Sequence, residues 1–187
     1  MKSLVQVLAI AAAALFLNGC ASNATTEGMT VEQEIAQNGL NGKLANSVQV
    51  DSVSGGLETN PMWVSRISSD GFRVALEASL KNAGYGSSDS KNPRYVLTVT
   101  IKKVHQPFFG FSMTVTSVIE YVLTDIKTKR IIFDQELTAL YTAGFSSALY
   151  GPTRLRLANE GSAKENIKML LADFRTTDPS TIHVKIK

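Results

Sequence analysis

Few residues of this 187-residue chain have the types and spacing that catalysis or metal binding requires. The chain has one cysteine, Cys20, and two histidines, His105 and His183, which excludes an internal disulfide and a zinc site built from several cysteines. Asp134 and Glu136 are spaced by two and would share one strand face, as paired carboxylates can, but no nucleophile or second acidic pair accompanies them. We therefore expect these carboxylates and histidines to be surface residues.

The sequence also lacks the short motifs of common catalytic and nucleotide-binding sites. It contains no G-x-S-x-G elbow, no Walker-type phosphate loop and no H-E-x-x-H pair. The formal charge is only +3, and the basic residues do not form a stripe interleaved with aromatic rings. These features predict a protein that is not an enzyme, has no metal or dissociable cofactor, and has no nucleic-acid partner.

The cysteine lies where a secretory signal would end. A basic start, Met1-Lys2, precedes an apolar run over residues 4–16. This run is shorter than the roughly 20 apolar residues that a membrane-spanning helix needs. A basic start, a short apolar run and a small residue before the cleavage point are typical of a signal peptide.

The end of this run, Leu17-Asn18-Gly19-Cys20, resembles the bacterial lipobox, although Asn18 stands where the lipobox usually has a small residue. The resemblance implies that residues 1–19 are a lipoprotein signal peptide, that the sulfur of Cys20 carries diacylglycerol, and that the new amino terminus carries an acyl chain. Two or three chains hold a protein on a membrane firmly, whereas one binds only marginally. Ala21-Ser22 lacks the aspartate that resembles the inner-membrane retention signal, which implies the periplasmic face of the cell outer membrane.

The rest of the chain divides into a tether and one domain. Residues 20–44 are rich in small and polar side chains with scattered apolar ones, and are expected to form a flexible tether from the lipidated Cys20. Residues 45–187 have the length and apolar content of a single periplasmic domain.

Apolar residues in the domain recur at strand spacing in four segments. Strands are predicted at residues 48–53, 94–104, 111–124 and 131–141. The polar turn at residues 125–129 joins the last two strands and is too short for parallel pairing, so these strands are expected to form an antiparallel hairpin.

Two further segments have helical spacing. One runs from about residue 68 to Ala83, with Gly84 at the position of a helix-terminating glycine. The other runs from about residue 154 to 174, and Gly161 inside it indicates a bend or close backbone packing. The residues of this helix that are expected to face solvent are Arg156, Glu160, Lys164 and Lys168.

The order β-α-β-β-β-α predicts an α+β fold. Each helix has one apolar stripe and each strand one apolar face, so we expect a two-layer sandwich in which two helices cover one face of an antiparallel sheet of about four strands. The other face would be polar enough to meet water or a partner, through Thr98, Thr100, Lys102, Thr114, Thr116 and Glu120.

The chain resembles the YajG-type family of small bacterial outer-membrane lipoproteins. The resemblance rests on the lipobox, the apolar spacing of the first helix (Phe72, Leu76, Leu80, Ala83, Gly84, Tyr85), the strand pair and the late helix with Ala158, Asn166 and Ile167. More loosely, the layout is similar to α+β accessory lipoproteins of the cell envelope. The resemblance implies an envelope location and a supporting role, with no catalytic residues to transfer.

Two apolar loops are the best candidates for contact with a partner. The segment from Pro107 to Phe111 holds three phenylalanines, and the segment from Gly144 to Gly151 follows the third long strand. Both should lie at the sheet end opposite the 125–129 turn, where they would form an interface or fold back to plug the sheet. The candidate interface residues are Phe108, Phe109, Phe111, Phe145, Leu149 and Tyr150.

Three functions fit these observations. The first is a non-catalytic, lipid-anchored module that binds an envelope protein complex or a polymer such as peptidoglycan. The second is a periplasmic binder of lipid or a small ligand, which would need a groove between helices and sheet. The third is an enzyme of unrecognised type, which would need at least two titratable groups to converge in a cleft.

Overall fold

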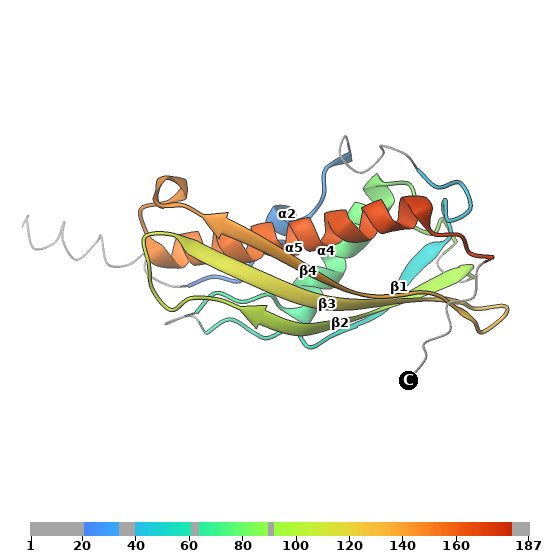
Figure 1. Ribbon diagram of the computed structural model, residues 1–187, viewed down its shortest axis with the longest axis horizontal. Coiled ribbons are helices and arrows are strands. Elements are labelled where there is room, and N and C mark those ends of the chain that lie inside the picture. The colour runs from blue at the N-terminus through green and yellow to red at the C-terminus, as the bar shows by residue number, and fades with distance from the viewer. Residues whose placement is uncertain (1–20, 34–39, 61–63, 90–91, 181–187) are drawn as a thin grey trace, which may run out of the picture.

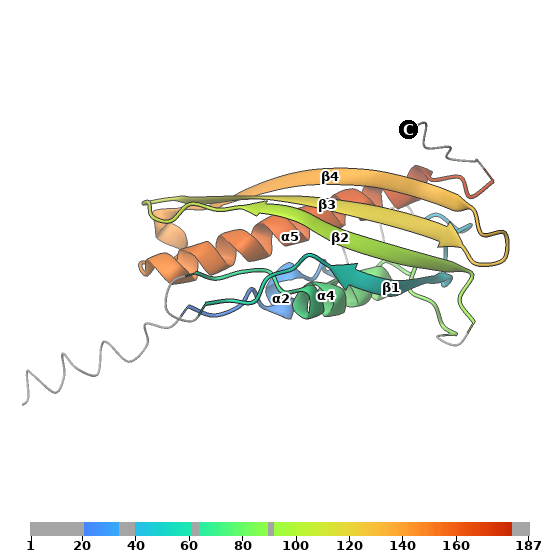
Figure 2. The ribbon, with the colours of Figure 1, turned by 90° about the horizontal axis from the view of Figure 1, so that it is seen from below.

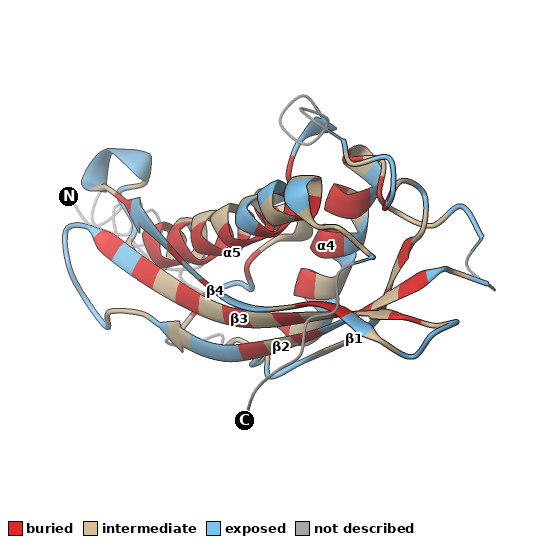
Figure 3. Ribbon diagram, turned by 45° about the vertical axis from the view of Figure 1, so that its right-hand side comes forward, coloured by how far each residue is buried: buried red, intermediate tan, exposed pale blue. Residues whose placement is uncertain are grey.

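Alternating apolar residues form four strands close to where the sequence predicts them. The computed structural model describes residues 21–33, 40–60, 64–89 and 92–180. The strands are β1 (Val48–Ser54), β2 (Tyr95–His105), β3 (Met113–Asp125) and β4 (Ile131–Ala143), and they lie in one sheet in the order β1-β2-β3-β4. Inward residues of β3 are buried at every second position, which Figure 3 shows as red and tan bands along the strand.

The sheet is mixed, which corrects the predicted antiparallel sheet. β2, β3 and β4 pair antiparallel, but β1 pairs parallel with β2. Helix α4 (Ser69–Asn82) lies between β1 and β2 in the sequence and returns the chain to the end of the sheet where β1 began. A crossover of this kind produces parallel neighbours, whereas the short turns after β2 and β3 produce antiparallel ones.

Helices cover one face of the sheet, so the predicted two-layer α+β architecture is confirmed (Figures 1 and 2). α5 (Gly151–Thr176) packs on β3 and β4, and α4 packs on β1. A third, short helix, α2 (Thr26–Met29), lies against both of them in the helical layer.

Aromatic side chains fill the space between the two layers. The ring of Phe174 on α5 packs edge-to-face against Tyr85 and Phe133, with centroid separations of 5.6 and 5.4 Å. Phe72 and Tyr121 are also fully buried. Because protein interiors are closely packed, these rings leave the described layers with a filled interior.

A buried polar network fixes α5 on the sheet. Asn166 accepts a hydrogen bond from the Tyr121 hydroxyl (2.9 Å) and donates to the carbonyl of Leu137 (2.9 Å). The Ser162 hydroxyl donates to the Ser117 hydroxyl (2.9 Å). Burial raises the pKa of Tyr121 well above its usual value, so this hydroxyl stays protonated and able to donate. A network of this kind selects one position of the helix, because any shift leaves buried polar groups unpaired.

Gly161 provides close backbone packing, as its place in the helix indicates. A Cβ at this position would lie 2.3 Å from the Cγ and Cδ1 atoms of Tyr141 on β4. These atoms are at the root of the ring, so the ring cannot give way by a small motion of its far end. Glycine at this position lowers the helix propensity of α5 but allows α5 and β4 to pack closely.

We expect Gly161→Ala to lower the free energy of unfolding by about 1–2 kcal/mol, because overpacking outweighs the gain in helix propensity. In a Tyr141→Ala background the same substitution should raise it by about 1 kcal/mol, the intrinsic difference between glycine and alanine in a helix. Urea denaturation of the four proteins measures both effects. Equal effects in the two backgrounds would contradict the packing explanation.

Candidate functional site

The two apolar loops lie together at one end of the sheet, as predicted. Met113 at the start of β3 is opposite Ala143 at the end of β4, so the loops over residues 106–112 and 144–150 leave the same end. The second loop includes the short helix η2 (Phe145–Ser147). The rings of Phe111 and Phe145 are in contact across the two loops, at a centroid distance of 6.1 Å.

The six candidate interface side chains point away from the core. Phe108, Phe109, Phe111 and Leu149 are 91, 87, 80 and 82% exposed, and Phe145 and Tyr150 are about half exposed. Figure 3 shows η2 and the β2–β3 loop in pale blue at this end. These side chains therefore do not plug the sheet. We call the six residues the apolar end.

Arg154 connects the loops of the apolar end. Its side chain is buried and donates hydrogen bonds to the carbonyls of Ala148 (2.7 Å) and Leu149 (2.8 Å) in one loop and Gly110 (3.1 Å) in the other. Its guanidinium also lies 5.3 Å from the centre of the Phe145 ring, a cation–π distance. Arg154 was not among the predicted site residues, although an arginine directly after an apolar loop, at the start of a helix, was a usable signal.

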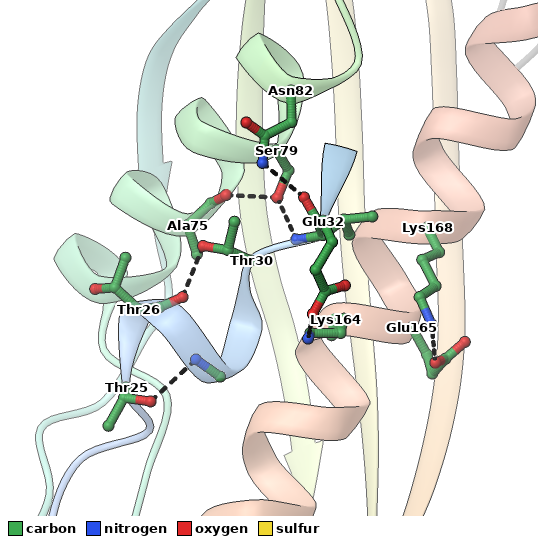
Figure 4. A network of polar contacts seen from close by, with 12 residues as sticks. Thr25, Thr26, Thr30, Glu32, Ala75, Ser79, Asn82, Lys164, Glu165 and Lys168 are labelled. Carbon is green, nitrogen blue, oxygen red and sulfur yellow. Dashed lines mark hydrogen bonds and ion pairs between the residues drawn. The ribbon is translucent and has the colours of Figure 1, made fainter. Parts of the chain in front are cut away.

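Residues 21–33 are packed on the domain, which corrects the predicted flexible tether over this part of residues 20–44. Met29, Val31 and Leu44 are fully buried in the main core. The backbone of Val31 is bound on both sides by α4, since its N–H donates to Ser79 and its carbonyl accepts from Asn82, each at 2.9 Å. Figure 4 shows these two side chains reaching the segment. The core therefore begins well before residue 45.

A buried carboxylate holds the start of this segment. One oxygen of Glu160 accepts from the backbone N–H and the hydroxyl of Thr25, both at 2.9 Å, and from the guanidinium of Arg156 at 3.0 Å. Glu160 is 5% exposed, so the prediction that it faces solvent was wrong. A buried carboxylate is stable only when it is paired and hydrogen-bonded, and Thr25 supplies two of those bonds. We call this arrangement the Glu160 clamp.

An ion pair fixes the same segment to α5 a turn further on. Glu32 lies 2.7 Å from the ammonium group of Lys164, and Figure 4 shows the two side chains meeting. The hydrogen bond from Lys164 lowers the pKa of Glu32. Because Glu32 is exposed, this pair supports the position of the segment without dominating its stability.

The described amino-terminal residues lead to the apolar end. The N–H of Ala24 donates to the carbonyl of Arg66 (3.0 Å), and Arg66 lines a cavity of about 260 Å³ together with Pro107 and Phe108. Figures 1 and 2 both show the blue segment beginning on the side of the molecule where the β2–β3 loop and η2 lie and running from there to α2. Cys20 itself lies outside the described residues, but it is bonded directly to Ala21.

The titratable residues considered for catalysis are not brought together. His105 on β2 pairs with Thr116 on β3, which in turn pairs with Leu140 on β4. Glu136 is four residues along β4 from Leu140, so His105 and Glu136 are about 16 Å apart. Asp134 is further along β4, and His183 is outside the described residues. Within the described ranges, no three side chains of the metal-binding types converge.

Cavities of the described structure lie at its periphery. One of about 530 Å³ lies beside the edge strand β1 and α4, and one of about 230 Å³ lies near Gly55, Ile67 and Lys102. The first of these is bordered by Val48 and Val50 of β1 and by Leu80 of α4, so it lies between a helix and the edge of the sheet, where a ligand groove was considered. The space between α5 and the sheet is occupied by the buried rings described above. None of the described helices is both long and apolar enough to cross a bilayer.

Comparison with known proteins identifies relatives in fold. No protein-family model matches the chain, and no curated protein matches its sequence. A solved structure from Xanthomonas campestris, assigned to the DUF330 family, superposes with a TM-score of 0.50 at 11% identity, covering 70% of this chain and 86% of its own. At this identity the likeness shows a shared fold.

Two other solved structures are named as lipoproteins. A protein of Caulobacter crescentus has a TM-score of 0.48 at 14% identity, covering 75% of this chain and 93% of its own. A minor lipoprotein of Acinetobacter baumannii has a TM-score of 0.49 at 12% identity, covering 71% and 92%. None of these three structures is named as a member of the YajG-type family.

Glu160→Ala should release residues 22–31 from the domain, because Thr25 loses its acceptor and Arg156 its partner. Hydrogen bonds to charged groups contribute about 2 kcal/mol, so amides of this segment should exchange roughly 30-fold faster with solvent. Hydrogen exchange followed by mass spectrometry measures this change. Glu165→Ala is the matched control, since Glu165 pairs only with Lys168 on the same helix; equal exchange in the two variants would contradict the clamp.

Proposed function

We propose that this protein is a lipid-anchored lipoprotein of the cell envelope, attached through Cys20 to the periplasmic face of the outer membrane, and that it acts as a non-catalytic accessory module. The lipobox pattern at Leu17–Cys20 supports the anchor, and Ala21-Ser22 supports the outer membrane. Its covalent lipid is diacylglycerol on the sulfur with an acyl chain on the amino terminus. Its partner is another envelope protein or peptidoglycan.

The Glu160 clamp is the observation that carries this proposal. Three residues lie between Cys20 and Ala24, and the four steps of a fully extended chain from one to the other span about 14 Å. A connection this short restricts the height and orientation of the domain above the bilayer, which suits a module that supports an envelope complex. The clamp therefore favours a positional role.

The open face of the sheet is the broadest surface available to a protein or polymer partner. The described helices cover the opposite face, and the open face exposes Thr98, Thr114, Thr138 and Glu136. It is crossed by the ion pair between Lys102 and Glu120 at 2.9 Å. A polar, β-branched surface of this kind can exchange hydrogen bonds with a partner, and non-obligate interfaces are about as polar as the rest of a protein surface.

The anchor is tested by Cys20→Ser in the full chain. The variant should lose metabolic labelling by palmitate and keep its first nineteen residues, because the sulfur that receives the lipid is absent. Labelling is read by autoradiography and the mass of the product by mass spectrometry. Ser22→Ala is the neighbouring control and should be labelled as the parent protein is. Undiminished labelling of Cys20→Ser would refute the proposed anchor.

The accessory role is tested by photocrosslinking in cells from a residue analogue placed at Thr138 on the open face. We expect an adduct of one discrete mass that contains an envelope protein or a peptidoglycan fragment. The same analogue at Lys127, exposed on the turn between β3 and β4, is the control and should give no such adduct. Absence of an adduct from Thr138 and from further positions at Thr98 and Glu136 would contradict a partner on this face.

A further inference from the structure

We infer that the apolar end of the domain is a membrane-contact surface that lies in the headgroup region of the bilayer holding the anchor. This inference rests on the proposed lipidation of Cys20 and names the occupant of a surface that the proposed function leaves unassigned. Three independent observations support it: the place where the described chain begins, the chemistry of the side chains, and the charge around them.

The first observation is the position of the anchor. Ala24 is bound to Arg66, and Arg66 borders the same cavity as Phe108. Cys20 is four residues before Ala24, so its sulfur cannot reach the far end of sheet strands that are about 40 Å long. With residues 24–31 held by the Glu160 clamp and α4, the lipid chains must leave the domain near its apolar end.

The second observation is the set of exposed side chains. Phe108, Phe109 and Leu149 are more than 80% exposed, which is unusual for large apolar residues on a surface in water. Phenylalanine and leucine enter the boundary between headgroups and acyl chains favourably, and Tyr150 has the amphipathic ring that is common at membrane interfaces. The side chains belong to two loops that Arg154 holds together, so they form one surface.

The third observation is the charge of the same region. Residues 99–119 and 137–159, which include both apolar loops and the strand ends beside them, contain no aspartate or glutamate. Of the basic residues in these ranges, Arg154 is buried against loop carbonyls, Lys102 and Arg156 pair with Glu120 and Glu160, and Lys103 is exposed. Apolar loops without carboxylates suit a bilayer that contains anionic lipids, because no like charge opposes their contact with the headgroups while the rings enter the boundary.

The test uses the full lipidated protein with one added cysteine. Since the thiol of Cys20 is consumed by the anchor, Phe109→Cys provides a single reactive thiol for an environment-sensitive fluorophore, and Phe109 is too exposed for its loss to unfold the core. Lys127→Cys, exposed on the opposite end of the sheet, is the matched control. Both are placed in vesicles of phosphatidylethanolamine and phosphatidylglycerol, with and without phospholipid carrying a nitroxide quencher.

The probe at Phe109 should shift its emission to the blue and lose about half of its intensity to the lipid-borne quencher, as expected for a side chain in the headgroup region. The probe at Lys127 should do neither. A vesicle-bound protein whose Phe109 probe stays in water would overturn the inference while leaving the anchor intact. Failure of the protein to sediment with vesicles would instead refute the anchor, and a crosslink from Phe109 to a protein in cells would overturn the bilayer as occupant.

Discussion

The buried carboxylate of Glu160 is the interaction on which the arrangement of this molecule depends. A carboxylate removed from water must be surrounded by donors, and here the backbone and side chain of Thr25 supply two of them, with Arg156 as the counter-charge. Gly28 is required by the same contact. A Cβ at this position would lie 2.4 Å from the Glu160 carboxyl carbon, so a larger residue would push the segment away from α5. As long as Glu160 keeps these hydrogen bonds, residues 25–28 have to lie on α5.

That constraint changes the physical meaning of the segment after Cys20. A free tether over residues 20–44 could extend to about 80 Å and would allow the domain every orientation. With Met29 and Val31 in the core, only a few residues are left between the lipid and the folded body. If Cys20 carries the proposed lipid, this short connection keeps the domain close to the membrane surface, and so too the side chains near its amino terminus, which a long tether would not hold there.

Much of the fold follows from local patterns, whereas the site depends on distant contacts. Alternation in β2, β3 and β4 and the spacing of Phe72, Leu76 and Leu80 in α4 predict elements close to those observed, because each is a local consequence of one apolar face. The parallel pairing of β1 was not predicted, because pairing depends on where the crossover through α4 places the chain. The Glu160 clamp joins residues that are 135 positions apart in the sequence. The segment it holds has only two buried apolar side chains, Met29 and Val31, which are too few to show a helix or strand period. Only part of the role of Arg154 could be predicted, since its acceptors Ala148 and Leu149 are near it in the sequence and Gly110 is 44 positions away.

The direction of the strands relates the two proposed contact surfaces, the apolar end and the open face of the sheet. The apolar end and the turn between β3 and β4 lie at opposite ends of the strands, which run along the longest dimension of the molecule (Figure 1). If the apolar end rests in the headgroups, the strands stand away from the bilayer and the turn lies about 40 Å from it. The plane of the open face is then parallel to the membrane normal. The face can contact proteins anchored in the same leaflet, or polymer that lies within about 40 Å of the bilayer. In this arrangement the anchor, the apolar end and the clamp fix the orientation of the domain, so the open face is the main surface that a partner can reach. An accessory module of this kind recognises its partner by position as well as by chemistry.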